Sequence, residues 1–330
     1  MIIAATTLCV VMTAGAQSPD FSGVEQFWQL AVTLQQGHEP NESDWDALFA
    51  TPGYAALEKR ERRRAALETG IRLALNPALV NERDRVLGGD SWTARVIRHV
   101  QQLPARKEEL VRLRDSLVND DFLTKAIALA ETLLPEGAHE RWGAPNVAFI
   151  FFLPDGRGYP DIIVSDLANV ASPSDLVPFF AHELTHFYYA QLARARGLDP
   201  RTPADKAKFT LLAKLFEESL GDQHDKGPFI DLSEAEWNRV SNDQARHDYL
   251  KDYRSEYGRA ASLATALERV LASNDANDID AFGRTLALEG RPLGFYMTRV
   301  IRHDLGDDRL KTLVGDPFAW YLAFTKARQE

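Results

Sequence analysis

A helical pattern interrupted once by a short strand-like segment is the feature that most constrains this fold. From residue 21 to about residue 140, apolar residues recur at three-and-four spacing, which predicts helices. The same spacing returns after residue 176 and continues to the end of the chain. Between these regions, Val147–Leu153 and Ile162–Val164 are short apolar runs separated by Pro, Asp and Gly, which predicts a β-hairpin. We therefore expect a mainly α protein with a small β-sheet (α+β).

Length and charge limit the organisation and the partners of the chain. Its 330 residues are 45% hydrophobic and 26% charged, which is typical of a globular protein with a full core. Near residue 140 the pattern of apolar residues changes from helical spacing to short strand-like runs. This change predicts a helical region at 17–140 and a second region at 141–330, although the two can also form one continuous domain. The net charge of -10 and the lack of a long Lys or Arg run disfavour nucleic acid and anionic membranes as partners.

The first sixteen residues predict export from the cytoplasm. They carry no charged side chain, an apolar stretch too short to span a bilayer, and a small-residue ending at Ala14-Gly15-Ala16. This is typical of a signal peptide over residues 1–16, except that the usual Lys or Arg near the start is missing. A buried N-terminal strand or helix is the alternative. We expect a periplasmic or extracellular protein without stable membrane insertion after cleavage.

The cysteine count narrows the choice of metal ligands. Cys9 is the only cysteine and lies inside the predicted signal peptide, so the mature chain has no thiolate. Any metal site must therefore use His, Asp and Glu.

Helix start and stop signals position the polar residues of the second region. A helix is expected from Leu176 to Arg196, before Gly197, with Pro178 near its first turn. Thr202-Pro203 opens another helix, which is expected to end at about Gln223. In the first region, Thr51-Pro52 opens a long charge-rich helix through Leu75. Its run Glu58–Arg64 mixes both signs of charge, as a solvated helix face does.

The motif HELTH contains His182, Glu183 and His186, and it lies in the middle of the helix expected from Leu176 to Arg196. Two imidazoles four residues apart project from one helix face and can reach one metal ion. Glu183 is rotated by about a hundred degrees around the helix axis, which suits a base that takes a proton from a metal-activated water. The alternative is that both histidines are ordinary core or surface residues. Because the chain has only eight histidines, the complete motif within a helix is hard to obtain by chance.

A catalytic zinc needs a third protein ligand, which the motif itself does not supply. The extended motif HExxHxxGxxH is excluded because Tyr189 and Leu192 occupy its glycine and final histidine positions. Glu217 and Glu218 on the following helix are the acidic candidates. Glu218 is favoured because it shares a face with apolar residues, whereas Glu217 falls in a more exposed series. His224 and Asp225 are alternatives that we expect to lie past the helix end.

The segment Glu218-Ser219-Leu220-Gly221-Asp222, following HELTH, resembles the Glu-x-x-x-Asp ligand segment of gluzincins, the thermolysin-like metallopeptidase clan. The stretch from Trp142 to about Gly227 is similar to a group of exported zinc-dependent peptidases. The resemblance implies a zincin-like catalytic core at 141–330, with Glu218 as third zinc ligand and Asp222 orienting His182. It also implies a strand edge that binds substrate main chain.

The clan also uses a Tyr or His that stabilises the transition state. No motif marks this residue here; Tyr296 is our first candidate for the catalytic role, Tyr249 is another, and His247 and His303 follow.

These expectations lead to three alternative functions. The first is a metallopeptidase with one Zn²⁺ per chain and a peptide or protein substrate, in which Glu183 is the general base. The second is a zinc amidase or esterase that acts on another amide or ester. The third is an exported helical binding protein with a structural or decayed metal site, which the intact Glu183 disfavours because a structural site needs no base.

Overall fold

The structure, a computed structural model, describes residues 18–170, 173–233, 235–237 and 244–329. The predicted signal peptide at 1–16 lies outside the described residues.

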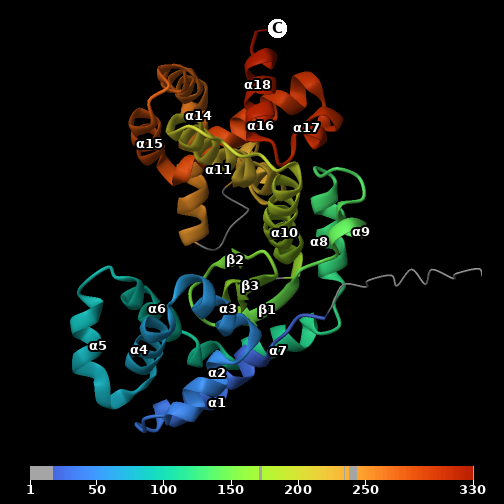
Figure 1. Ribbon diagram of the computed structural model, residues 1–330. Coiled ribbons are helices and arrows are strands. Elements are labelled where there is room, and N and C mark those ends of the chain that lie inside the picture. Colours follow the sequence, from blue (N-terminus) through green and yellow to red (C-terminus); the bar gives the residue numbers. More distant parts are fainter. Residues whose placement is uncertain (1–17, 171–172, 234, 238–243, 330) are drawn as a thin grey trace, which may run out of the picture.

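The fold class is confirmed, because helices surround one small sheet (Figure 1). Before the sheet come α1 (Ser22–Gln35), α2 (Glu42–Phe49), α3 (Pro52–Glu61), α4 (Arg64–Leu75), α5 (Val80–Leu87), α6 (Trp92–Val100), α7 (Lys107–Leu117), α8 (Phe122–Glu131) and α9 (Ala138–Trp142). After it come α10 (Pro173–Arg196), α11 (Pro203–Asp225), α12 (Gly227–Ile230), α14 (Gln244–Ser273), α15 (Ala276–Thr285), α16 (Arg291–Leu305), α17 (Asp307–Leu313) and α18 (Pro317–Ala327).

The sheet has three strands in the order β1-β3-β2 and differs from the predicted hairpin. β1 (Asn146–Ile150) runs parallel to β3 (Ile162–Asp166), and the short β2 (Gly156–Gly158) runs antiparallel to β3 at the sheet edge. The hairpin prediction for the two apolar runs is therefore wrong. The Gly-rich segment between them has the composition of a turn, but it forms the edge strand because glycine leaves room for close packing against a helix.

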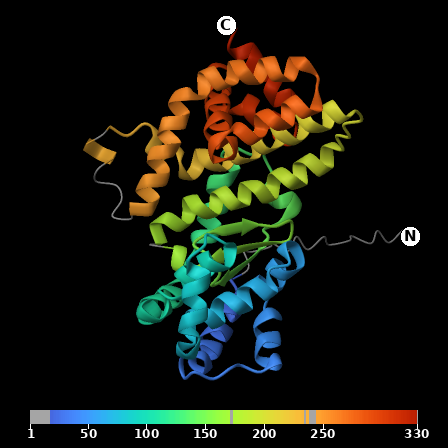
Figure 2. The same ribbon diagram turned by 90° about the vertical axis from the view of Figure 1, so that its left-hand side faces the viewer.

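The sheet lies between helices from both regions of the chain (Figures 1 and 2). On one face, α3 packs on Ala148 and Val164, with Gly53 at the contact. On the other face, the Phe149 ring packs against Phe180 of α10 at 5.7 Å. α11 then packs on α10, and α16 packs on α11. The layers are therefore α1 and α3, the sheet, α10 with α8 beside it, α11 and the C-terminal helices.

Buried aromatic rings fix the position of α10 on the sheet. Phe180 also contacts Phe122 of α8 at 5.1 Å, and Phe149 stacks on Phe21 at 5.0 Å. Both Phe149 and Phe180 are fully buried. Burying a side chain of this size stabilises a fold by roughly 1.5–3 kcal/mol. This packing holds the HELTH segment, which begins two residues after Phe180, next to the sheet.

Three local expectations need correction. The long helix expected from residue 52 to residue 75 is two helices, because Arg62 between α3 and α4 adopts a left-handed conformation with φ 53°. Pro178 lies at the sixth position of α10 instead of in its first turn. α11 extends to Asp225, so His224 and Asp225 lie inside its last turn instead of past its end.

Two expected helix boundaries agree with the structure. Gly197, with φ 62°, follows the last residue of α10. The Thr202 side chain accepts a hydrogen bond from the Asp205 backbone N–H at the start of α11, and Pro203 is its first helical residue.

Candidate metal centre

α10 brings the two histidines of the HELTH motif together. The Nε2 atoms of His182 and His186 lie 3.0 Å apart, and the ring centroids lie 4.8 Å apart. Burial lowers the pKa of His182 to about 3. Burial alone would also lower the pKa of His186, but the Glu217 carboxylate outweighs it and raises that pKa to about 9. The two Nε2 atoms thus face each other within hydrogen-bonding distance.

α11 places Glu218 opposite these two nitrogens. Glu218 Oε2 lies 3.8 Å from the Nε2 of His182 and 3.8 Å from the Nε2 of His186. Ligands around a tetrahedral zinc lie about 3.3 Å from one another when the bonds are about 2.0–2.2 Å long. The three atoms are therefore spaced as zinc ligands, and the three residues form a group that could hold a metal ion.

The bonding of Glu218 also fits a cation at this position. Its Oε2 atom is buried and accepts no hydrogen bond. The Arg291 guanidinium of α16 lies 2.9 Å away as an ion-pair partner, without hydrogen-bond geometry. A buried carboxylate oxygen without a hydrogen bond is costly unless a charge compensates it. Two nitrogens and one carboxylate oxygen also form the donor set of zinc hydrolases, so the residues fit zinc.

The Nδ1 atom of His182 faces two carboxylates from the last turns of α11. Asp225 Oδ1 lies 3.1 Å away in a hydrogen bond, whereas Asp222 Oδ1 lies 3.5 Å away. Asp222 was the expected orienting residue, but its Oδ2 atom accepts a hydrogen bond from Tyr253 OH at 2.7 Å. Lys226 forms ion pairs with both carboxylates. Asp225 thus contacts the nitrogen that faces away from Glu218, which makes it an orienting partner of the ring instead of a further ligand.

Burial and charge compensation shift the pKa values of these two carboxylates in opposite directions. Burial raises the pKa of Asp222 above its usual range. Burial would raise the pKa of Asp225 as well, but Lys226 and His182 beside it hold that pKa below its usual range. Asp225 is therefore ionised and can accept the Nδ1 proton of His182.

Glu217 and Arg291 are the contributions that sequence reasoning missed. Glu217 Oε1 lies 2.9 Å from His186 Nδ1, although its side chain is 33% exposed, as the sequence pattern predicted. Glu217 shares a helical face with exposed residues, so its position in the sequence did not predict this contact. Arg291 precedes Pro292 at the start of α16 and carries no sequence signal for a place beside Glu218.

α11 approaches the first histidine closely because residue 221 is glycine. A Cβ atom at Gly221 would lie 2.7 Å from the His182 ring, which is closer than side chains approach. Gly221 thus allows one helix to carry the third candidate ligand and to cover the first histidine.

Glu183 points from α10 toward strand β2. It is 8% exposed, and burial raises its pKa. A Cβ atom at Gly156 would lie 3.1 Å from Glu183 Oε1, and one at Gly158 would lie 3.1 Å from Glu183 Oε2. The two glycines therefore form a surface on which the carboxylate rests. A carboxylate with a raised pKa suits proton transfer near neutral pH.

The four candidates for a transition-state donor lie in different surroundings. Tyr249 is the one in contact with the His182 network, since Lys226 Nζ lies 5.9 Å from its ring centroid. The ring contacts of Tyr296 are with Tyr257 and Phe324. His247 packs on Trp237, and the His303 side chain is 87% exposed. Of the four, Tyr249 is therefore the residue that these contacts bring to the His182 network, and the donor role of Tyr296, our first candidate, stays a prediction.

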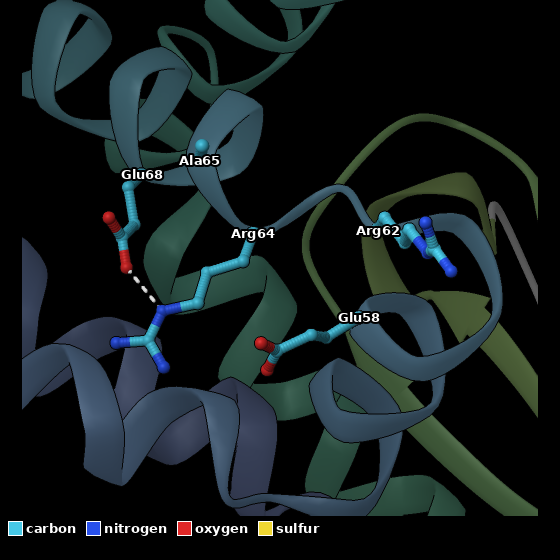
Figure 3. A pocket seen from close by; sticks show the side chains of 5 residues that line it. All are labelled: Glu58, Arg62, Arg64, Ala65 and Glu68. Atoms are coloured by element: carbon cyan, nitrogen blue, oxygen red, sulfur yellow. Dashed lines mark hydrogen bonds and ion pairs between the residues drawn. The ribbon is translucent and has the colours of Figure 1, made fainter.

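Two pockets in the described residues lie apart from these groups. One is lined by the charged run between α3 and α4, namely Glu58, Arg62, Arg64, Ala65 and Glu68 (Figure 3). Arg64 there is paired with Glu68 and with Asp46. The other is lined by Arg299, Arg302, His303 and Asp307. Neither pocket contains a residue of the HELTH motif.

Comparison with protein families gives a match over most of the chain. Residues 45–330 match a family model described as "Putative zinc dependent peptidase (DUF5700)". None of the proteins with curated descriptions and none of the solved structures matches the chain. The family match confirms the resemblance to zinc-dependent peptidases that the sequence predicted. Among the described residues, no helix has the length and apolar character needed to span a membrane.

Proposed function

We propose that this chain, which belongs to the DUF5700 family, is a zinc metallopeptidase in which His182, His186 and Glu218 hold one zinc ion and Glu183 is the general base. The observation that carries the proposal is the convergence of three donor atoms from two helices, with separations of 3.0, 3.8 and 3.8 Å. The third donor is a buried carboxylate oxygen that accepts no hydrogen bond.

The reaction follows from the positions of the side chains. A bound zinc supplies a Lewis acid that lowers the pKa of water to about 7 and polarises the scissile carbonyl. Glu183 accepts a proton from the attacking water and later donates it to the leaving amine. Asp225 and Glu217 hold the two imidazoles through Nδ1, so that both Nε2 atoms face Glu218. Tyr249 is our candidate donor for the oxyanion.

The two other functions that the sequence allows can be compared with this arrangement. No contact of the described residues favours a zinc amidase or esterase over a peptidase. A structural metal site would close with a fourth protein ligand and would not need a buried base. Glu183, resting on two glycines beside the histidines, supports an enzyme over an exported binding protein.

Metal analysis combined with a peptide-hydrolysis assay tests the proposal. Wild type and Glu183→Gln should each contain about one zinc per chain, and Glu183→Gln should lose hydrolysis by roughly 100-fold or more. His182→Ala should lose both zinc and hydrolysis. His303→Ala is the matched control, because this exposed histidine should leave both unchanged. A wild type that binds no zinc, or a fully active Glu183→Gln, would contradict the proposal.

We also propose export of the protein, on the basis of residues 1–16 alone. Mass spectrometry of the mature protein, recovered from the periplasm or the medium, should find a chain that begins at Gln17. A full-length chain that stays in the cytoplasm would contradict export.

A further inference from the structure

Successive residues from Gly156 to Tyr159 point alternately toward α10 and toward α3. The Cβ directions of Gly156 and Gly158 face α10 and Glu183. Arg157 and Tyr159 face the opposite side, where both side chains contact Glu61 of α3. This alternation follows from the two-residue repeat of a strand. The short edge strand therefore links the general base on one face to an N-terminal helix on the other.

Glu61 holds two side chains of this strand with one oxygen atom. Its Oε1 accepts a hydrogen bond from Arg157 Nε at 3.0 Å and another from Tyr159 OH at 2.7 Å. The Glu61 and Arg157 side chains are 23% and 28% exposed. A charge-assisted bond between partly buried groups restricts motion more than an exposed ion pair does. Glu61 is the last residue of α3 and precedes the left-handed Arg62, which ends that helix.

Arg157 forms further contacts within the protein. Besides Glu61, its guanidinium pairs with Asp155 and donates to the Gly156 carbonyl oxygen at 2.7 Å. Asp155 Oδ1 accepts a hydrogen bond from the Gly156 backbone N–H at 2.9 Å. These bonds fix the start of β2 and engage the Nε and Nη1 atoms of the guanidinium. The role of Arg157 is therefore in holding the strand.

The position of β2 decides how much space Glu183 has. A Cβ atom at Gly158 would also lie 3.4 Å from the His186 Cβ atom, so the strand backbone is close to the second histidine as well. A movement of β2 toward or away from α10 would therefore change the space around the Glu183 carboxylate directly. Within the described part of the chain, β2 pairs through main-chain bonds with β3 alone, and that pairing covers three residue pairs. Side-chain contacts must supply the rest of its restraint.

We propose that Glu61 is a positioning residue for the general base: through Arg157 and Tyr159 it holds β2 against α10 and so fixes the carboxylate of Glu183. The inference rests on the proposed function. It makes α3, in the N-terminal helical region, a part of the catalytic unit.

Glu61→Ala tests the proposal, and Asp161→Asn is its matched control. The exposed Asp161 side chain forms an ion pair of 3.1 Å with Arg60 of α3, instead of with Arg157 or Tyr159. In Glu61→Ala, amide hydrogen exchange of residues 155–159 should become at least about 10-fold faster, because the strand opens locally. With zinc bound, kcat on a peptide substrate should fall roughly 10-fold with KM within about twofold, because only the base is displaced. Asp161→Asn should match wild type in both measurements.

Two further variants separate positioning from a general loss of stability. Glu61→Gln keeps an acceptor oxygen and should lie between wild type and Glu61→Ala in both exchange and kcat. Glu61→Ala should keep the zinc stoichiometry of wild type. Adding Arg157→Gln to Glu61→Ala should cost little beyond the first change, because both residues act through one network.

The outcomes also separate this inference from the proposed function. If residues 155–159 exchange at the wild-type rate in Glu61→Ala, the positioning role is wrong, whatever the activity. If exchange rises in Glu61→Ala while kcat is unchanged, Glu61 holds the strand without affecting the base, and the proposal is again wrong. If wild type hydrolyses no peptide, the proposed function fails, and the positioning of a base fails with it; faster exchange would then show a structural clamp only.

Discussion

The two histidines of the centre are held in different ways. Behind His182 lies a buried network of two carboxylates, a lysine and a tyrosine, in which Asp222 is completely buried. Behind His186 lies a single carboxylate, Glu217, whose side chain is one-third exposed. Electrostatic interactions in a buried network are strong and depend on every partner, whereas solvent weakens an exposed pair. The surroundings of His182 are therefore part of the core, whereas those of His186 are partly open to solvent.

The largest effect should come from removing the one cation that the two carboxylates behind His182 share. Lys226→Met removes the lysine partner of Asp225 and leaves Asp222 with the Arg291 guanidinium, 4.0 Å away, as its ion-pair partner. We expect a loss of about 3–5 kcal/mol in the free energy of unfolding of metal-free protein, measured by urea denaturation. Lys59→Met, on an exposed position of α3, is the control and should change it by less than about 0.5 kcal/mol. Equal effects of the two variants would show that the network is not a buried one.

The close contact between α11 and His182 should be the next most sensitive feature. Gly221→Ala places a Cβ atom 2.7 Å from the His182 ring. We expect a loss of about 1–3 kcal/mol in unfolding free energy, together with weaker zinc binding, because the ring must move. Gly258→Ala on α14, where the added atom meets nothing within 4 Å, should instead be neutral or stabilising by up to about 1 kcal/mol. Unaltered zinc affinity in Gly221→Ala would mean that α11 does not fix the ring.

A smaller effect is expected when the hydrogen-bond partner of His182 loses its charge. Asp225→Asn should weaken zinc binding roughly 10- to 100-fold, as the loss of an orienting carboxylate does. Competition with a chromogenic chelator measures this change. Asp222→Asn should weaken zinc binding less, because Asp222 lies farther from Nδ1 and is bound by Tyr253. The reverse order would return the orienting role to Asp222.

The smallest effect on zinc binding is expected at Glu217, the partly exposed partner of His186. Glu217→Gln should weaken zinc binding by less than about 10-fold, because a glutamine oxygen still accepts the His186 Nδ1 proton and solvent screens the lost charge. The difference between this variant and wild type should shrink further at high salt, whereas the effect of Asp225→Asn should persist. Equal salt dependence of the two variants would remove the distinction between the two histidines.

The sequence predicted what depends on the repeat of a single helix. The spacing of His182 and His186, the favoured face of Glu218 and the start of α11 at Thr202-Pro203 all follow from local helical geometry. These features could be predicted because neighbouring residues of one element determine them. The mainly helical class follows in the same way from apolar spacing over long stretches.

The remaining features depend on how elements meet in space. Three contacts join separate helices: Glu217 with His186, Asp225 with His182, and Arg291 with Glu218. The parallel pairing of β1 with β3 could not be predicted because a glycine-rich segment has the propensity of a turn. Likewise, no local pattern showed that Arg62 would adopt a left-handed conformation.

A crystal structure of the zinc-loaded protein, with anomalous diffraction measured at the zinc edge, is the most direct test of the centre. We expect one zinc peak per chain, about 2.0–2.2 Å from the Nε2 atoms of His182 and His186 and from a Glu218 carboxylate oxygen. A peak at another group of residues, or a bound zinc with Glu218 out of reach, would contradict this expectation.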